Sequence, residues 1–495
     1  MRLNKPAKSP AGYDNMSLAI YWHRDDLRLH DNPCLHRAVN GYDRVLPIFI
    51  FDPRQFEMLP LGFRKTGYHR FIFLKDCIAA LQQSYQEKGG NLLVVLGRPE
   101  EILADLLREQ QADIVLAQAE VASEETTVER SIAAALQTEF ELIWGKSLYH
   151  RDDLPFGFDE IPATSKSFRI RAQKEAGVRE LLPTPDRIDC PELTDWGKLP
   201  VADELGFRRE EALDFQAPVP AGEKAALERL HYYTFETRLV EKYKWTRNKS
   251  LGIDYSSKFS AWLNRGCLSP RQVYHTVKRY EKEVKRNIST WWLIFEVVWR
   301  DFFIFSHAKY GDKIFRAGGI KNRETDWKHD KELFDRWCRG ETGIPFADAH
   351  LRELWETGFM SNRGRVNTAS FLTRDYEIDW RWGAAWFESQ LLDYEVSANW
   401  FNWNTQATEI YYTNPVHQSM KYDKNGEYIL SQLPELAALP FPFFHAPWLT
   451  QEFTGVEPVK SYPQPAFIQK KWGRSIGNIR KEIPEEYEDL VAKKG

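Results

Sequence analysis

The sequence predicts an α/β fold, with a doubly wound parallel sheet in the N-terminal part and a larger all-helical domain after it. Strand-like apolar runs alternate with amphipathic stretches up to residue 145, the pattern of strand–helix–strand units. From residue 221 onward, helical spacing dominates and strand patterns are rare. The chain has 495 residues, which is too long for one hydrophobic core, so at least two domains are expected.

The strands of the first domain are predicted from short runs of aliphatic and β-branched residues, which are typical of parallel strands buried on both faces. These runs cover residues 18–22, 45–51, 91–97, 113–118 and 140–145. The amphipathic stretches between them predict helices at 64–89, 99–110 and 123–139. Such alternation gives a Rossmann-like sheet, whose ligands usually sit beyond the carboxyl ends of the strands. Neither GxGxxG nor P-loop spacing is present, so a standard dinucleotide or nucleoside triphosphate site is not supported.

The remaining segments complete the predicted domain organisation. Residues 1–16 have no apolar core, so we expect a disordered arm and no secretory signal before the domain at 17–145. Residues 146–220 are rich in Pro, Asp and Arg and predict a connector over the surface. The all-helical domain then covers 221–495. Its predicted helices are 222–243, 258–264, 270–284, 289–310, 331–338, 348–357, 364–374 and 382–392.

Composition excludes several classes of protein. Hydrophobic residues make up 43% and charged residues 28%, as in soluble globular proteins, and no run approaches the roughly 20 apolar residues of a membrane helix. The five cysteines are scattered without CxxC spacing, so we expect a reducing cytoplasm and neither disulfides nor an iron–sulfur site. The net charge of −4 does not indicate nucleic acid, although a local basic groove stays open. Eighteen Trp residues indicate either a large aromatic core or a protein that handles a flat ligand or electrons.

The stretch 254–274 places three serines around a lysine, just before a helix start at Ser269–Arg271. The serines are Ser256, Ser257 and Ser260, and Lys258 lies among them. Hydroxyls, backbone N–H groups and one cation at a helix N-terminus suit a phosphate or pyrophosphate. Simple N-capping by serine is the alternative explanation.

Two further stretches combine charged and polar side chains on predicted helices. Glu296, Trp299 and Arg300 fall at i, i+3 and i+4 and share one helix face, which could seat a nucleobase. The alternative is an ordinary Glu296–Arg300 pair over a core ring. Asn362, Arg363 and Arg365 begin an otherwise apolar helix, and the alternative there is a solvated basic face.

The stretch LLDYEVSANWFNW, 391–403, is too polar for ordinary core. Its carboxylates, Asp393 and Glu395, have no His or Cys at ligand spacing, so we expect no metal. A carboxylate can instead accept from a ribose hydroxyl or orient an arginine such as Arg365. A Ser–His–Asp hydrolase is not supported, because no G-x-S-x-G pattern is present.

Taken together, these motifs resemble the cryptochrome/photolyase family of flavoproteins over nearly the whole chain, and the DASH branch in particular. The resemblance rests on YWHRDDLRLHDNPCL (21–35), FDPRQF (51–56), YHRDDLPF (149–156), SKSFRIRAQ (165–173), TRNKSLGIDYSSKFSAWLNRGCLSPR (246–271) and ELWETGFMSNRGRVNTASFL (353–372). The resemblance implies an α/β antenna domain joined to a helical domain that binds FAD.

The resemblance also implies residue roles in flavin binding. Ser256 to Ser260 match the family's diphosphate-binding stretch, Arg365 and Asp393 match a paired arginine and carboxylate, and Asn399 matches the residue that faces flavin N5. The full set of implied flavin-binding residues is Tyr243, Ser256, Ser257, Lys258, Phe259, Ser260, Arg300, Asn362, Arg365, Asp393, Tyr394, Glu395 and Asn399. We expect Trp400 and Asn402 only to pack against neighbouring side chains.

The implied activity is light-driven repair of cyclobutane pyrimidine dimers in DNA. Trp403, Trp380 and Trp327 match the family's tryptophan chain for photoreduction of the flavin, and with Asn399 they form the predicted catalytic set. The implied substrate-binding residues are Glu296, Trp299, Arg300, Asn362 and Arg363. The target base must leave the stack, which costs least in single-stranded or looped DNA.

Further expectations concern the antenna and the assembly. Glu120 matches the family's pterin-binding glutamate, which implies a methenyltetrahydrofolate antenna, with a deazaflavin as the alternative. We expect a monomer that binds no membrane.

Three positions leave the family pattern: Glu395 stands where Asp is usual, Thr405 where an aromatic ring is usual, and Val366 where a polar residue or Met is usual. The segment after Trp403 is also short and lacks a Gly-rich loop. These departures keep a second function open, a blue-light receptor that signals through flavin redox change without repair.

Overall fold

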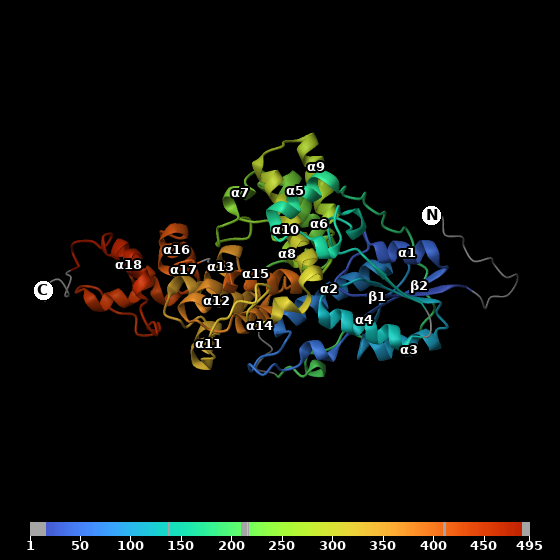
Figure 1. Cartoon of the computed structure of the whole chain (residues 1–495), viewed down its shortest axis with the longest axis horizontal. Coiled ribbons are helices and arrows are strands. Elements are labelled where there is room, and N and C mark those ends of the chain that lie inside the picture. Colours follow the sequence, from blue (N-terminus) through green and yellow to red (C-terminus); the bar gives the residue numbers. More distant parts are fainter. Residues whose placement is uncertain (1–15, 137–138, 209–214, 216, 409–411, 488–495) are drawn as a thin grey trace.

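The computed structural model describes residues 16–136, 139–208, 215, 217–408 and 412–487. Figure 1 shows an elongated molecule with the β-sheet and α1–α4 at one end, a central group of helices around α10, and α16–α18 at the other end. The predicted sites therefore lie on one continuous molecule, with the helical region directly against the sheet domain.

The sheet has five parallel strands in the order β3-β2-β1-β4-β5. The order reverses at β1, which confirms the predicted doubly wound topology. Every predicted strand is present within two residues of its expected ends. The strands are β1 (Leu18–His23), β2 (Arg44–Phe51), β3 (Leu93–Leu96), β4 (Ile114–Gln118) and β5 (Glu139–Ile143).

Four helices cover the two faces of the sheet: α1 (Pro33–Gly41), α2 (Tyr68–Glu87), α3 (Pro99–Glu109) and α4 (Ser123–Ala135). Because side chains alternate along a strand, β1 sends Leu18, Ile20 and Trp22 to the face covered by α3 and α4. Ala19 and Tyr21 face the other core, which continues without a break into the helical region. The prediction lacked α1, which Asn32 caps by accepting from the Leu35 N–H, 3.0 Å away.

The segment 146–220 is not only a surface connector, as the sequence suggested. It contains α5 (Ser165–Glu175), which Thr164 caps. From α5, the ring of Phe168 packs 5.8 Å from Phe302 and 5.9 Å from Phe305. The prediction overlooked this because the apolar residues are spaced widely among Pro and Asp. This segment therefore contributes to the core that joins sheet and helices.

The helical region is built around α10 (Ile288–Tyr310), which packs against α5, α7, α9 and α15. Asn287 caps it by accepting from the N–H groups of Ser289 and Thr290. The other helices are α6 (Glu223–His231), α7 (Tyr243–Thr246), α8 (Ser260–Asn264), α9 (Pro270–Glu283), α11 (Lys331–Cys338), α12 (Pro345–Thr357), α13 (Asn362–Ser370), α14 (Trp380–Gln390), α15 (Val396–Thr408), α16 (Pro415–Tyr422), α17 (Glu427–Gln432) and α18 (Gly473–Arg480).

Two predictions in this region need correction. The single helix expected at 222–243 is broken into α6, a π-helical turn at Tyr232–Glu236, a 3-10 turn at Leu239–Glu241 and the start of α7. The predicted helices also omitted α15, which begins at Val396, within the stretch 391–403. The buried face of α15 carries polar side chains and so lacks an apolar stripe. Among the described residues, no helix has both the length and the apolar character needed to cross a membrane.

Candidate functional site

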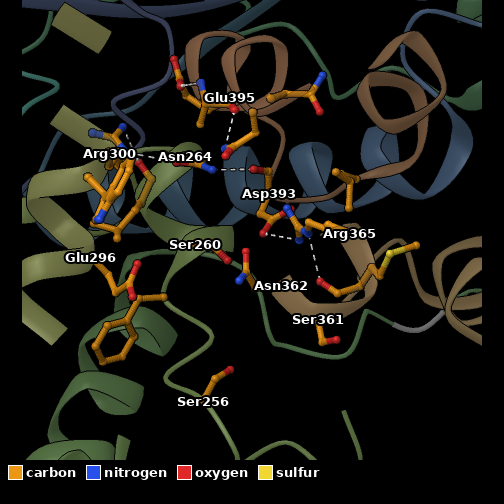
Figure 2. A pocket seen from close by; sticks show the side chains of 18 of the residues that line it. Ser256, Ser260, Asn264, Glu296, Arg300, Ser361, Asn362, Arg365, Asp393 and Glu395 are labelled. Carbon is orange, nitrogen blue, oxygen red and sulfur yellow. Dashed lines mark hydrogen bonds and ion pairs between the residues drawn. The ribbon is translucent and has the colours of Figure 1, made fainter. Parts of the chain in front are cut away.

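A cavity of about 520 Å³ opens between α8, α10, α13 and α15. That volume is within the range of small-molecule and cofactor sites. Most of the predicted site residues line it: Tyr243, Ser256, Ser257, Lys258, Phe259, Ser260, Glu296, Trp299, Arg300, Asn362, Arg365, Asp393, Tyr394, Glu395, Asn399 and Trp403. The fold thus brings four distant stretches of the chain to one place (Figure 2).

Arg365 and Asp393 form an ion pair on one wall. Nη2 of Arg365 lies 2.9 Å and 2.8 Å from the two carboxylate oxygens of Asp393. The Arg365 Nε also donates to the Met360 carbonyl at 3.0 Å, so the guanidinium is held from two sides (Figure 2). From the sequence, either Asp393 or Glu395 could pair with Arg365, and Asp393 forms the pair.

The serine stretch before α8 does not cap that helix. The N-cap of α8 is Phe259, with no side-chain cap hydrogen bond, although the Ser257 Oγ accepts from the Phe259 N–H at 3.5 Å. Capping does apply to Ser269, whose Oγ accepts from the N–H groups of Arg271 and Gln272 at the start of α9. Ser256, Ser257 and Ser260 all line the cavity beside Lys258.

Lys258 adds a buried cation to this wall. Its backbone has a φ of 63°, and its Nζ lies 3.7 Å and 4.2 Å from the ring centres of Tyr255 and Phe359. Burial lowers the pKa of Lys258 to about 7. Burial also raises the pKa of Glu353, whose charge acts on Lys258, to about 7. Serine hydroxyls with one cation fit the diphosphate expected here.

On α10, Glu296 does not pair with Arg300, so the ordinary i, i+4 explanation is wrong. Glu296 Oε1 accepts from Arg247 and from Trp292 Nε1, the latter at 2.8 Å. Burial raises the pKa of Glu296, and Arg247 and Trp292 oppose that rise. The ring of Trp299 packs 5.5 Å from Phe303 beside the same cavity.

Arg300 instead joins three separate segments. Its Nε donates to Asn264 Oδ1 at 3.1 Å, and its Nη groups donate to the carbonyls of Leu263 and Lys146. Asn264 in turn donates from Nδ2 to the Asp393 carbonyl. Figure 2 shows this chain of bonds from Arg300 through Asn264 to Asp393. Arg300 thereby fixes the end of the sheet domain against the cavity wall.

Glu395 continues this wall toward the sheet domain. Its Oε2 accepts from the Ala398 N–H at 2.7 Å, and its Oε1 lies 3.7 Å from Lys146 Nζ, without a hydrogen-bond partner among the described residues. Lys146 Nζ also forms an ion pair with Glu120. Burial alone would raise the pKa of Glu395, but Lys146 and Arg300 bring it below its usual value.

Of the three predicted relay tryptophans, Trp403 lines the cavity, whereas Trp380 and Trp327 do not. The Nε1 atoms of Trp380 and Trp327 donate to the same carbonyl, that of Ala317, at 3.0 Å and 3.2 Å. Trp403, on α15, packs its ring 5.0 Å from Phe387 on the neighbouring helix α14. Near it, Asn399 donates from Nδ2 to the Ala384 carbonyl at 3.1 Å.

Some predicted residues lie outside the cavity, and some cavity residues were not predicted. Arg363 donates to Asn248 at 3.2 Å and does not line the cavity. Glu120 lies with Lys146 in the sheet domain. Arg247, Asn264 and Lys146 were not predicted from the sequence, because each acts through a partner far along the chain. Arg247 had one local signal, its place four residues after Tyr243.

His350 is a buried core residue: its Nδ1 lies 2.7 Å from the Phe346 carbonyl, and burial lowers its pKa to about 4. Within the described ranges, no group of His, Cys, Asp or Glu could hold a metal ion.

Comparison with known proteins gives a consistent result. Residues 19–186 match the family model described as DNA photolyase, and residues 292–477 match the FAD binding domain of DNA photolyase. The chain is 43% identical over 464 residues to a protein named cryptochrome DASH from Natronomonas pharaonis, covering 91% of this chain and 98% of the relative. The crystal structure of a Synechocystis cryptochrome superposes with a TM-score of 0.86 at 40% identity, covering 94% of this chain and 99% of the other. A class III photolyase from Agrobacterium tumefaciens superposes with a TM-score of 0.79 at 26% identity, covering 96% and 100%.

Proposed function

Since this chain belongs to the cryptochrome/photolyase family and carries its FAD-binding domain, we propose that it is a DASH-type photolyase. Its substrate would be a cyclobutane pyrimidine dimer in single-stranded or looped DNA. We further propose that it acts as a monomer in the cytoplasm. The five free thiols support a reducing compartment of that kind.

One observation carries the proposal: a single cavity contains both a polar wall suited to a flavin and a carboxylate–indole wall suited to a base. Arg365 and Asp393 occupy the first wall, and Glu296 and Trp299 belong to α10, on another side. Figure 2 shows Glu296 and the Arg365–Asp393 pair on separate sides of the pocket. A donor and an acceptor of electrons could therefore meet inside one cavity.

The residues present fit FAD. Buried polar atoms without a hydrogen-bond partner among the described residues include Glu395 Oε1 and Tyr255 Oη, and both residues line the cavity. Such atoms are costly unless a ligand satisfies them. Ser256, Ser260 and Lys258 would hold the diphosphate, while Arg365 and Asn399 would orient the ring system. When bound and reduced, the flavin supplies the light-excited electron that opens the cyclobutane ring and then receives it back.

The chain's own residues would hold the dimer. Trp299 offers a flat ring for stacking, and Glu296 offers a carboxylate to hydrogen-bond a base edge. Arg247 and Trp292 Nε1 both donate to this carboxylate and hold it at the cavity wall. Arg300, Asn362 and Arg363 are the proposed contacts to the rest of the substrate, of which Arg363 lies outside the cavity.

We propose that Trp403, Trp380 and Trp327 relay an electron from the surface toward the cavity. Trp403 borders the cavity, while Trp380 and Trp327 converge on the Ala317 carbonyl. Indole rings have low ionisation energies, which suits this role.

We also propose a folate antenna at Glu120, with a deazaflavin as the alternative. Glu120 receives a hydrogen bond from Gln118 at 3.1 Å, and Glu125 near it has a buried oxygen without a partner among the described residues. Burial raises the pKa of Glu125 to about 7. A protonated Glu125 could donate to a ring nitrogen or carbonyl of a pterin.

Repair of dimer-bearing oligonucleotides under blue light tests the main proposal. Purified holoprotein should remove dimers from single strands, and Glu296→Gln should reduce removal while FAD photoreduction stays normal. The matched control is Glu332→Gln, on α11 and away from the cavity. If the wild-type protein photoreduces FAD but leaves every dimer intact, the photolyase proposal fails.

One observation favours the second function, a blue-light receptor without repair. Thr405 lines the cavity and offers no ring on which a base could stack. A receptor of this kind would pass the photoreduction test and fail the repair test.

A further inference from the structure

Trp245 is a large aromatic residue exposed to solvent next to the cavity. Its side chain is 70% exposed, whereas Tyr243 and Arg247, two residues before and after it in the chain, line the cavity. An exposed indole gives up the favourable burial that such rings usually contribute. Figure 1 places its helix, α7, at the outer edge of the helical region, away from the sheet.

A row of aromatic rings connects this position with the cavity. On α10, Trp292, Phe295 and Trp299 follow one helix face, with ring centres 5.2 Å and 6.1 Å apart along the row. Lys244 connects these rings with Trp245, because its Nζ lies 5.0 Å from the ring centre of Trp292 and 4.9 Å from that of Trp245. We call Trp245, Trp292, Phe295 and Trp299 the aromatic row.

The backbone fixes the row in place. The Lys244 N–H donates to Ser289 Oγ at 3.2 Å, so α7 is attached to the first turn of α10. Arg247, which follows α7, lies with its guanidinium carbon 5.2 Å from the Trp292 ring and bonds to Glu296. The outer end of the row is therefore held at a defined distance from the cavity wall.

The charges around the outer end are positive. In the described part of the chain, Lys242, Lys244 and Lys249 form no ion pair with a carboxylate. Two neighbouring carboxylates are already paired, Glu241 with Lys285 and Asp254 with Arg229. A polyanion would find uncompensated cations beside an exposed ring.

We propose that the aromatic row binds single-stranded DNA beside the lesion, with Trp245 stacking on an unpaired base outside the cavity. Lys244 and its neighbours would contact the phosphates on either side. Alternating rings and cations are the arrangement by which proteins hold single strands without reading their sequence. In duplex DNA the bases already stack on one another, so Trp245 would favour single strands. This inference rests on the proposed function, because it places the strand's lesion in the cavity.

The test uses holoprotein in the dark and a fluorescein-labelled, undamaged oligothymidylate, with binding followed by anisotropy over a range of salt concentrations. Trp245→Ala should bind about ten-fold more weakly, as expected for the loss of one stacked base, and Trp245→Phe should keep most of the affinity. Lys244→Gln should make the salt dependence shallower, reducing the magnitude of the slope of log K (the association constant) against log salt by about one. Trp355→Ala is the matched control, because Trp355 is also exposed, at 44%, and stacks on Trp386 on α14.

Each outcome separates this inference from the proposed function. If Trp245→Ala binds the oligonucleotide as tightly as wild type, the inference is overturned, even if the wild type repairs dimers. If wild type fails to repair but its DNA binding depends on Trp245, the photolyase proposal is lost, and the contact between Trp245 and single strands is supported without a lesion in the cavity. If Trp245→Ala abolishes a concentration-dependent dimer seen by light scattering, without changing DNA binding, Trp245 serves self-association instead and the inference is overturned.

Discussion

Nη2 of Arg365 lies within 2.9 Å of both carboxylate oxygens of Asp393, on the wall of the cavity. The Asp393 carboxylate is buried, and the arginine is only partly exposed. A carboxylate in this position loses much of its hydration, so its charge is tolerable only because the guanidinium compensates it. The pair therefore links the stability of the helical region to the shape of the cavity wall.

Asp393→Asn should lower both stability and FAD content. The substitution leaves the Arg365 charge beside a neutral amide, at a cost of about 2–4 kcal/mol for a largely buried pair. The measurements are the FAD absorbance per purified protein and urea unfolding. Asp335→Asn, which breaks an exposed pair with Lys331 on α11, is the control and should change stability by less than about 0.5 kcal/mol. Equal FAD content in Asp393→Asn and the wild type would contradict this prediction.

Trp403→Phe should slow FAD photoreduction by an order of magnitude or more while FAD stays bound. Phenylalanine keeps the contact with Phe387 but is far harder to oxidise than indole. The flavin absorbance under blue light, with an external reductant present, gives the rate. Trp472→Phe is the control, since Trp472 is equally buried but stacks on Phe371 near the C-terminal helices. If both variants reduce at the wild-type rate, Trp403 serves only as core.

The sheet could be predicted from sequence because each strand is a local pattern of its own. Runs such as 45–51 and 113–118 consist mainly of consecutive apolar residues that are buried on both faces of the sheet, and strands form there. The stretch 391–403 was harder, because the buried face of α15 is polar where it borders the cavity. Ser397 and Asn399, both buried, remove the apolar period by which a helix is usually recognised.

The connections within the site could not be predicted, because they join residues far apart in the chain. Arg300 donates to Lys146 across 154 positions, and Asn264 donates to Asp393 across 129. No pattern in a single sequence encodes such distances. The roles carried over from the family stay predictions, although the fold brings most of those residues to one cavity.

FAD binding should weaken as the pH rises above about 7. Burial lowers the pKa of Lys258 to about 7 in the empty protein, so its amine is only partly charged at neutral pH. A bound diphosphate favours the ammonium form, so binding takes up a proton, and the affinity falls where free Lys258 loses its proton. Ionisation of Glu353 near the same pH acts in the same direction, since a carboxylate repels the diphosphate.

Titration of apoprotein with FAD between pH 6 and 9 measures this effect. The affinity of wild type should decline across this range, and Lys258→Met should bind more weakly with a flatter profile. Lys249→Met provides the control, because Lys249 is exposed and outside the cavity lining. A wild-type affinity that does not change with pH would show that Lys258 stays fully charged.

Lys146→Met should destabilise the protein by about 3–5 kcal/mol, because it leaves two buried carboxylates without their cation. Lys146, Glu120 and Glu395 each have side chains only 5% exposed, and the lysine is the ion-pair partner of both acids. Lys146 helps to hold the pKa of Glu395 below its usual value against the effect of burial, so without Lys146 the folded-state pKa of that carboxyl rises. Protonation of Glu395 then relieves the uncompensated charge, so the deficit should be large at pH 8 and shrink as the pH falls.

Urea unfolding of Lys146→Met at pH 8 and pH 5.5 checks both the size and the sign of this effect. Adding Glu120→Gln to Lys146→Met should recover part of the stability at pH 8, because one of the two uncompensated charges is removed. Lys331→Met is the control on an exposed pair and should show neither effect. The FAD content of the same samples, measured before urea is added, tests whether Lys146 also holds Glu395 in place at the cavity wall. If the variant is unstable at pH 8 but binds FAD normally, Lys146 serves only to join the sheet domain to the helices and has no role in FAD binding.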